Sequence, residues 1–321
     1  MQTILLRPAD PDRDFAQLAA WFSTLEDEQS TESSLKNWYH KHRDRIIHMV
    51  AEDDQGQPLG FYWATRDRSD PTLLTFYLFV RPEQRGQGLG RRLYGDLLRA
   101  VQEARATRLR ISIWDSCTEG LAFAARRGFV ERRHQIAMEL SLDAFDSRPY
   151  DAIIARLTAE GFRFTSMQEL GNTEEAQHRL YLLNDAAAAD TPGTDGEHPW
   201  ASFEDFQTSV CQSDWFKPDG QIVAIDTATG AWVAMSAITR LEGNDYAYNL
   251  FTGVDRLYRG RKLAQAVKVL ALRYARDVLQ ADTVRTHHNT QNLPMIAIDR
   301  KLGYVRLPGA ILMEKTYRLK M

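Results

Sequence analysis

The alternation of apolar and polar residues predicts a mixed α/β chain in which a similar series of elements occurs twice. In the first half, the pattern predicts helices at 15–22, 34–43, 87–104 and 118–127, and strands at 2–8, 46–52, 59–65, 72–80, 108–113 and 129–140. In the second half it predicts helices at 150–160, 173–184, 259–278 and 292–302, and strands at 161–167, 221–226, 231–239, 246–254 and 282–287, followed by a final strand pair. Asp, Ser and Pro collect at 141–149, and we therefore expect two domains, 1–145 and 146–321. The stretch 184–199 is rich in Ala, Asp, Thr, Pro and Gly and predicts a flexible loop.

The most informative pattern is a strand, a basic glycine-containing turn and an amphipathic helix, which occurs in both halves. The first turn reads Arg85-Gly86-Gln87-Gly88-Leu89-Gly90, and its degraded copy reads Arg259-Gly260-Arg261-Lys262-Leu263-Ala264. The first-turn N–H groups of such a helix have no intrahelical partners and lie at the positive end of the helix dipole. Glycines let an anion approach the backbone, so the turn predicts a site for a phosphate-bearing ligand.

Two other phosphate-binding motifs do not fit this turn. A nucleotide-hydrolysing P-loop requires Gly-Lys-Ser/Thr, where this chain has Gly90-Arg91-Arg92. A dinucleotide fold requires a glycine three residues after Gly88, where Arg91 stands. For one copy alone, a glycine-rich turn that only joins strand to helix and carries basic surface residues remains an alternative. The recurrence of the arginine and glycine positions disfavours this alternative.

The first turn resembles the pyrophosphate-binding signature Arg/Gln-x-x-Gly-x-Gly/Ala of the GNAT N-acetyltransferases. Arg85, Gly88 and Gly90 fill its defined positions. In the second copy Arg259 and Ala264 fit, whereas Lys262 replaces the first glycine. Each half also ends with a helix followed by glycine and an aromatic residue, at 128–129 and 303–304, as in that family. The tandem layout is similar to that of the mycothiol synthase type of acetyltransferase, which does not by itself carry over the substrate.

The resemblance implies two tandem GNAT-like α/β domains with acetyl-CoA as cofactor. It implies transfer of an acetyl group to an amine of a small molecule, by direct attack in a ternary complex. A non-catalytic acyl-CoA-binding or sensing protein and a protein-lysine acetyltransferase remain alternatives. The residues expected to bind the cofactor are Phe79, Val80, Arg85, Gly86, Gln87, Gly88, Leu89, Gly90 and Arg91 in the first half, and Thr252, Gly253, Val254, Arg259, Gly260, Arg261, Lys262, Leu263, Ala264, Asn289 and Asn292 in the second.

The second half is expected to hold the active site, because its late helix opens with Asn and Met and its strand 246–254 is polar. Acetyl transfer needs a base to take a proton from the amine. Glu242 and Asp245 are the candidate bases and Tyr248 a candidate acceptor-site or catalytic residue, although surface carboxylates and an ordinary strand aromatic explain the same residues. Family members often carry a catalytic Tyr four residues before the late glycine; here Ala124 and Asp299 stand there.

Composition argues against nucleic-acid-binding, membrane and metal-binding classes of protein. The chain of 321 residues has a formal net charge of −3, which gives no reason to expect a nucleic-acid partner. No apolar run approaches membrane-spanning length, so no membrane association is expected. Adjacent His287 and His288 point to opposite strand faces and do not readily chelate one metal. The isolated Cys117 and Cys211 suit a reducing cytoplasm and form no metal motif, so we expect a cytoplasmic protein without a metal site. The acceptor, the acyl length and the oligomeric state stay open.

Overall fold

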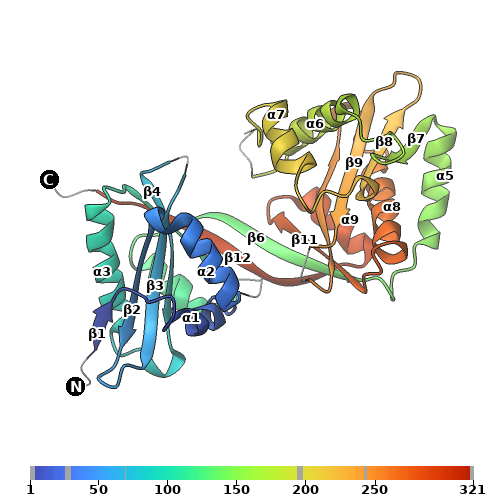
Figure 1. Ribbon diagram of the computed structural model, residues 1–321. Helices are drawn as coiled ribbons and strands as arrows, with labels where there is room; N and C mark the ends of the chain where they lie inside the picture. The colour runs from blue at the N-terminus through green and yellow to red at the C-terminus, as the bar shows by residue number, and fades with distance from the viewer. Residues whose placement is uncertain (1–3, 26–29, 69, 194–197, 242–243, 319–321) are drawn as a thin grey trace. The chain divides into compact units, whose positions relative to one another are not determined.

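The chain folds into two compact units, each built around six strands of mixed β-sheet (Figure 1). The computed structural model describes residues 4–25, 30–68, 70–193, 198–241 and 244–318. Unit 1 comprises residues 1–134 together with 309–321, and unit 2 comprises residues 135–308. The expected mixed α/β fold class is confirmed.

Unit 1 contains four helices and seven strand segments among its described residues. Its sheet order is β1-β2-β3-β4-β5-β12, and its pairs are antiparallel except for the parallel pair β4–β5. The elements are β1 (Leu5–Arg7), α1 (Phe15–Phe22), α2 (Glu32–His42), β2 (Ile46–Glu52), β3 (Pro58–Arg66), β4 (Leu73–Val80), α3 (Leu89–Glu103), β5 (Arg108–Trp114), α4 (Thr118–Ala125), the start of β6 (Val130–Ser141) and the end of β12 (Val305–Thr316).

Unit 2 repeats this order with its own elements. Its sheet runs β6-β11-β10-β9-β8-β7, and only the β10–β11 pair is parallel. The elements that complete it are α5 (Asp151–Ala159), β7 (Phe162–Ser166), α6 (Glu174–Ala189), α7 (Phe203–Phe206), β8 (Gln221–Asp226), β9 (Trp232–Thr239), β10 (Ala247–Val254), α8 (Leu263–Asp277), β11 (Thr283–Asn289) and α9 (Leu293–Leu302).

The last strand of each unit's sheet comes from the other half of the sequence. Residues 135–141 of β6 pair with β11 in unit 2, and residues 310–316 of β12 pair with β5 in unit 1. The units therefore differ from the contiguous halves 1–145 and 146–321 that composition suggested. Two strands with the same alternation satisfy either sheet equally well, so the sequence pattern does not distinguish these partners.

Each sheet is covered on both faces, because alternate strand residues point to opposite sides. On β3, Phe61 and Trp63 pack with residues of α1 and α2. Tyr62 and Ala64 pack instead with the apolar stripe of α3, which is formed by Leu89, Leu93, Leu97 and Val101. In unit 2, Val223 of β8 packs with α6 and Ala224 with α8. Each glycine-containing turn thus leads into a helix anchored on its sheet.

The segment expected to be a flexible loop at 184–199 begins as helix. Helix α6 continues through Ala189, because the run of alanines at 186–189 favours helix and Ala187 is buried. Of the described residues in this segment, only those after Ala189 lie outside the helix.

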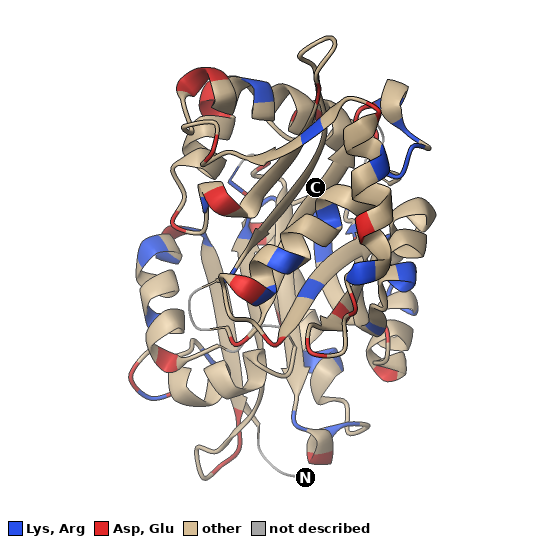
Figure 2. Cartoon of the chain, turned by 90° about the vertical axis from the view of Figure 1, so that its right-hand side faces the viewer, with Lys and Arg blue, Asp and Glu red and all other residues tan. Residues whose placement is uncertain are grey.

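Charged residues of both signs are interspersed over the helices and loops in the view of Figure 2. Among the described residues, no helix has the length and apolar character needed to cross a bilayer. The same part of the chain contains no group of three or more His, Cys, Asp or Glu residues arranged to hold a metal ion.

Candidate active site

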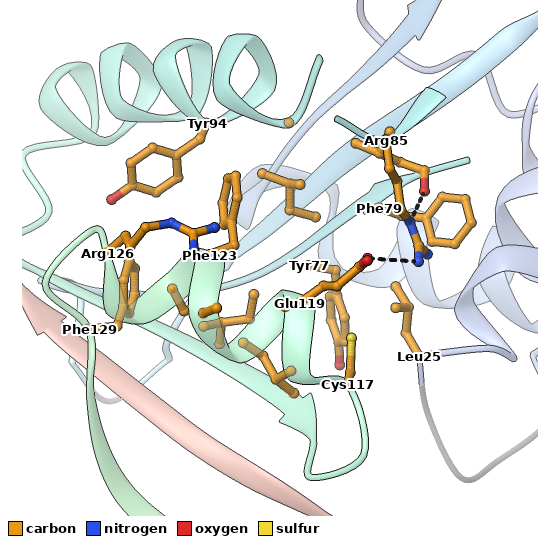
Figure 3. Close-up of a pocket in the computed structure, with 18 of the residues that line it drawn as sticks. Leu25, Tyr77, Phe79, Arg85, Tyr94, Cys117, Glu119, Phe123, Arg126 and Phe129 are labelled. Carbon is orange, nitrogen blue, oxygen red and sulfur yellow. Dashed lines mark hydrogen bonds and ion pairs between the residues drawn. The ribbon is translucent and has the colours of Figure 1, made fainter. Parts of the chain in front are cut away.

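A cavity of about 690 Å³ opens in unit 1 where β4 and β5 separate. The two strands pair only from Leu73 with Arg108 to Thr75 with Arg110. Beyond that point, residues 76–80 of β4 and 111–114 of β5 line the two sides of the cavity. Helices α3 and α4 supply the rest of the wall, as Figure 3 shows. The space lies directly beside the first glycine-containing turn.

The first turn presents its arginine and glycines to this cavity. Gly86, Gly88, Gly90 and Arg91 line it together with Arg85. Gly86 and Gly88 have φ values of +74° and +88°, a region that favours glycine. The Arg85 guanidinium donates from Nε to the Val80 carbonyl (3.2 Å) and lies 3.6 Å from Glu119 (Figure 3).

Two residues of this turn that were expected at the cofactor do not line the cavity with their side chains. The side chain of Leu89 is buried in the core beneath α3. The amide of Gln87 turns back and donates to the Glu83 carbonyl (3.0 Å). Any contact they make with a phosphate would come from their backbone N–H groups, which are in the turn that begins the helix.

Away from the turn, the cavity wall is mostly apolar and aromatic. Phe79 stacks on Trp21, with ring centroids 4.8 Å apart, and Phe76 lies 5.8 Å from Phe129. Sequence reasoning missed most of these lining residues, because they are spread over strands and helices with no common motif: Leu25, Phe76, Tyr77, Tyr94, Trp114, Cys117, Phe123, Arg126 and Phe129.

Unit 2 repeats the strand split and the local geometry of the turn. Strands β10 and β11 pair only at Ala247 with Val284 and at Tyr248 with Arg285. Arg259 donates from Nε to the Val254 carbonyl at 3.2 Å, the same bond that Arg85 makes with Val80. Lys262 takes the left-handed conformation (φ +75°) that Gly88 takes in unit 1. Replacement of that glycine by lysine therefore preserves the path of the backbone, at a conformational cost that glycine avoids.

Other residues expected to bind the cofactor in the second half make contacts within unit 2. The Arg261 guanidinium lies over the Tyr258 ring, 5.4 Å from its centroid, and the Leu263 side chain is buried. The Thr252 hydroxyl bonds to Ser236 (3.0 Å) and to Asn249 (3.3 Å). These contacts fix the strand just before the turn.

The second-half split contains a hydrogen-bonded pair of proton-carrying side chains. The Tyr248 hydroxyl on β10 lies 2.6 Å from Nδ1 of His287 on β11. Asp245 is exposed immediately before β10, and Glu242 lies outside the described residues. The structure thus brings Tyr248 together with His287, which the sequence analysis named only in connection with metal chelation.

His288 faces the opposite side of β11, as strand geometry predicts, and joins a buried charged cluster. Its Nε2 lies 2.5 Å from Asp299, whose other oxygen pairs with Lys268. Lys268 and Asp299 are 1% and 0% exposed. Aligning Arg259 with Arg85 matches Lys268 to Tyr94, and aligning the late glycines matches Asp299 to Ala124, so the cluster occupies positions that line the cavity in unit 1.

The two asparagines of the late helix have separate roles in the structure. The Asn289 side chain accepts a bond from the Gln291 backbone N–H (2.9 Å), and so closes the turn before α9. Asn292 is the N-cap residue of α9 but makes no side-chain capping bond.

Comparisons with known proteins agree with this architecture. Residues 13–129 match the model of the acetyltransferase (GNAT) family. A mycothiol acetyltransferase of Thermobifida fusca (strain YX) is 28% identical over 239 residues, which cover 70% of this chain and 69% of that protein. A GCN5-related N-acetyltransferase from Sphaerobacter thermophilus has a TM-score of 0.68 at 17% identity, covering 99% of this chain and 97% of that one. A tandem GNAT protein from the clavulanic acid biosynthesis pathway has a TM-score of 0.65 at 18% identity, covering 99% and 100%. At these identities, the two solved structures establish the fold.

Proposed function

We propose that this chain is an N-acetyltransferase of the GNAT family, and that it transfers the acetyl group of acetyl-CoA to the amine of a small molecule by direct attack. The observation that carries the proposal is the strand split that lies beside an arginine-bearing turn in both units. A split sheet exposes unpaired backbone N–H groups of the diverging strand, which are suited to hold a carbonyl oxygen as it gains charge.

The residues of the first half fit the cofactor. Arg85 and Arg91 supply positive charge beside the glycines of the turn, where the cofactor phosphates would bind. The aromatic walls of the strand split suit the largely apolar arm of the cofactor. When bound, acetyl-CoA would supply the acetyl group as an activated thioester. Gly86, Gly88 and Gly90 leave the backbone of the turn accessible to phosphate oxygens.

Proton transfer is proposed for the second half, where Tyr248 and His287 share a 2.6 Å hydrogen bond. With Nδ1 unprotonated, His287 accepts the phenolic proton, so the Tyr248 oxygen can in turn take a proton from an amine held nearby. Asp245 and Glu242, which precede β10 in the sequence, remain the proposed carboxylate bases.

Separate replacement of the two turn arginines tests this division of roles. Because a charge-assisted bond to a phosphate contributes about 1.5–3 kcal/mol, Arg259→Ala should lower kcat/KM for acetyl-CoA about 10- to 100-fold. Arg85→Ala should weaken cofactor binding to unit 1 and leave turnover measurable. The readout is thiol release from acetyl-CoA with a panel of amines, and the matched control is Arg179→Ala, a surface arginine of α6 paired with Glu175. Turnover that survives loss of Arg259 but not of Arg85 would place the chemistry in the first half.

A further inference from the structure

The end of α6 and the residues after it lie across the second cofactor turn. We call this segment, residues 187–193, the strap. It begins against β10, where a Cβ added to Gly253 would meet the Ala187 Cβ at 2.7 Å. It ends against the turn after β11, where a Cβ added to Gly193 would lie 2.2 Å from the Asn289 amide nitrogen. Glycine at both positions permits this close approach, so the strap spans from one side of the strand split to the other.

Between these two contacts, the strap places a carboxylate on the arginines of the turn. Asp190 accepts hydrogen bonds from Arg256 Nε (3.1 Å) and Nη2 (2.5 Å), one at each carboxylate oxygen. It also accepts a bond from Arg259 Nη2 at 2.9 Å. The Arg256 and Arg259 bonds hold the pKa of Asp190 below its usual value, so the carboxylate is ionised at neutral pH. A carboxylate of the chain itself thus occupies Arg259, the residue that the repeated motif predicts to bind a phosphate.

The first half shows what the same turn looks like without such a strap. Besides its bond to the Val80 carbonyl, Arg85 makes a looser contact with Glu119 at 3.6 Å, and both side chains are about half exposed or more. Phe79, which aligns with Gly253, stacks on Trp21 and lines the open cavity. The difference between the two turns therefore lies in what covers them and not in their backbone.

We propose that the strap is a gate on the site at the second turn, which takes a phosphate-bearing ligand of the coenzyme A class, and that Asp190 must leave Arg259 before the ligand binds there. This inference rests on the proposed function, since it takes the second turn to be a coenzyme A site. A carboxylate and a phosphate compete for the same guanidinium donors, because both bind arginine through paired oxygens. The second site therefore binds coenzyme A more weakly than the open first site, by the cost of displacing the strap.

Calorimetric titration with coenzyme A tests the gate in a background where the first turn is disabled. Arg85→Ala provides that background, and Asp190→Ala and Asp190→Asn are then added to it separately. Each should tighten binding at the second turn by up to about fivefold, because each removes the competing carboxylate, and the Asn variant also keeps the shape of the side chain. Adding Arg259→Ala should remove the gain. Glu175→Ala is the matched control, because it removes an exposed carboxylate from α6, the helix that leads into the strap. It should not tighten coenzyme A binding.

The possible results separate this inference from the proposed function. If the unaltered protein binds coenzyme A but neither Asp190 variant changes affinity at the second turn, the gate is refuted and the proposed function stands. If neither the unaltered protein nor any variant binds coenzyme A, the proposed function is refuted, and the gate with it. Hydrogen exchange of the unaltered protein gives a readout that does not depend on the variants folding: coenzyme A should speed exchange in the strap, and unchanged or slower exchange there at saturation of both sites would contradict the gate.

Discussion

Replacement of Asp299 by alanine should destabilise unit 2 more than any surface change in this chain. Asp299 is fully buried and pairs with the equally buried Lys268, with His288 on its other oxygen. Its removal leaves the Lys268 ammonium in the core without a counter-ion. Breaking a buried pair in this way costs about 3–5 kcal/mol, since the remaining charge keeps its desolvation penalty.

The two partners should be strongly coupled. Lys268→Met removes the cation and leaves Asp299 with His288 alone, which should cost about 2–4 kcal/mol. The double variant Lys268→Met/Asp299→Ala leaves no unpaired charge, so its loss should fall short of the sum by about 2 kcal/mol or more. The Tyr304 ring, whose centroid lies 5.0 Å from the Lys268 ammonium, can pack against the methionine.

Urea unfolding and calorimetry measure these losses. The change should appear in the transition of unit 2 alone, because all four side chains belong to it. Lys301→Met, an exposed lysine on the same helix as Asp299, is the control and should stay within about 0.5 kcal/mol. Additive losses, or a cost below about 1 kcal/mol for Asp299→Ala, would refute the assignment of a buried charged pair.

Two further predictions concern proton transfer and acid stability. Tyr248→Phe removes the oxygen that lies 2.6 Å from His287 and should lower kcat about 100-fold with the melting temperature nearly unchanged; an unaltered kcat in a steady-state assay would exclude Tyr248 from the proton path. Burial raises the pKa of Asp14, but bonds from Arg7 and from the Asp10 backbone outweigh it and leave the pKa lowered. A lowered folded pKa gives stability that is present above the unfolded value near 4 and is lost as pH falls through the folded pKa, so Asp14→Asn should cost much less at about pH 3 than at about pH 6 in urea unfolding. An equal cost at both pH values would contradict this.

The sequence determined the local elements and the candidate phosphate site. The apolar and aromatic run at 76–80 predicted β4, and the four-residue spacing from Leu89 to Val101 predicted α3, because these patterns depend on local burial. The recurrence of Arg85 as Arg259 predicted two equivalent turns, and in the structure each arginine makes the same bond with a strand carbonyl. Such features are set by neighbours within a few residues, so a single sequence contains them.

Only the tertiary structure decided which of these local features meet. Asp190 pairs with Arg256, which lies 66 positions away in the sequence, and Asp299 pairs with Lys268 of another helix. No spacing rule connects either pair. The exchange of β6 and β12 between the two sheets is likewise invisible in their patterns, since strand pairing is chosen by packing over the whole unit. The cavity of unit 1 and the covered turn of unit 2 arise from the same motif, and the difference comes from residues that fold back over it from elsewhere in the chain.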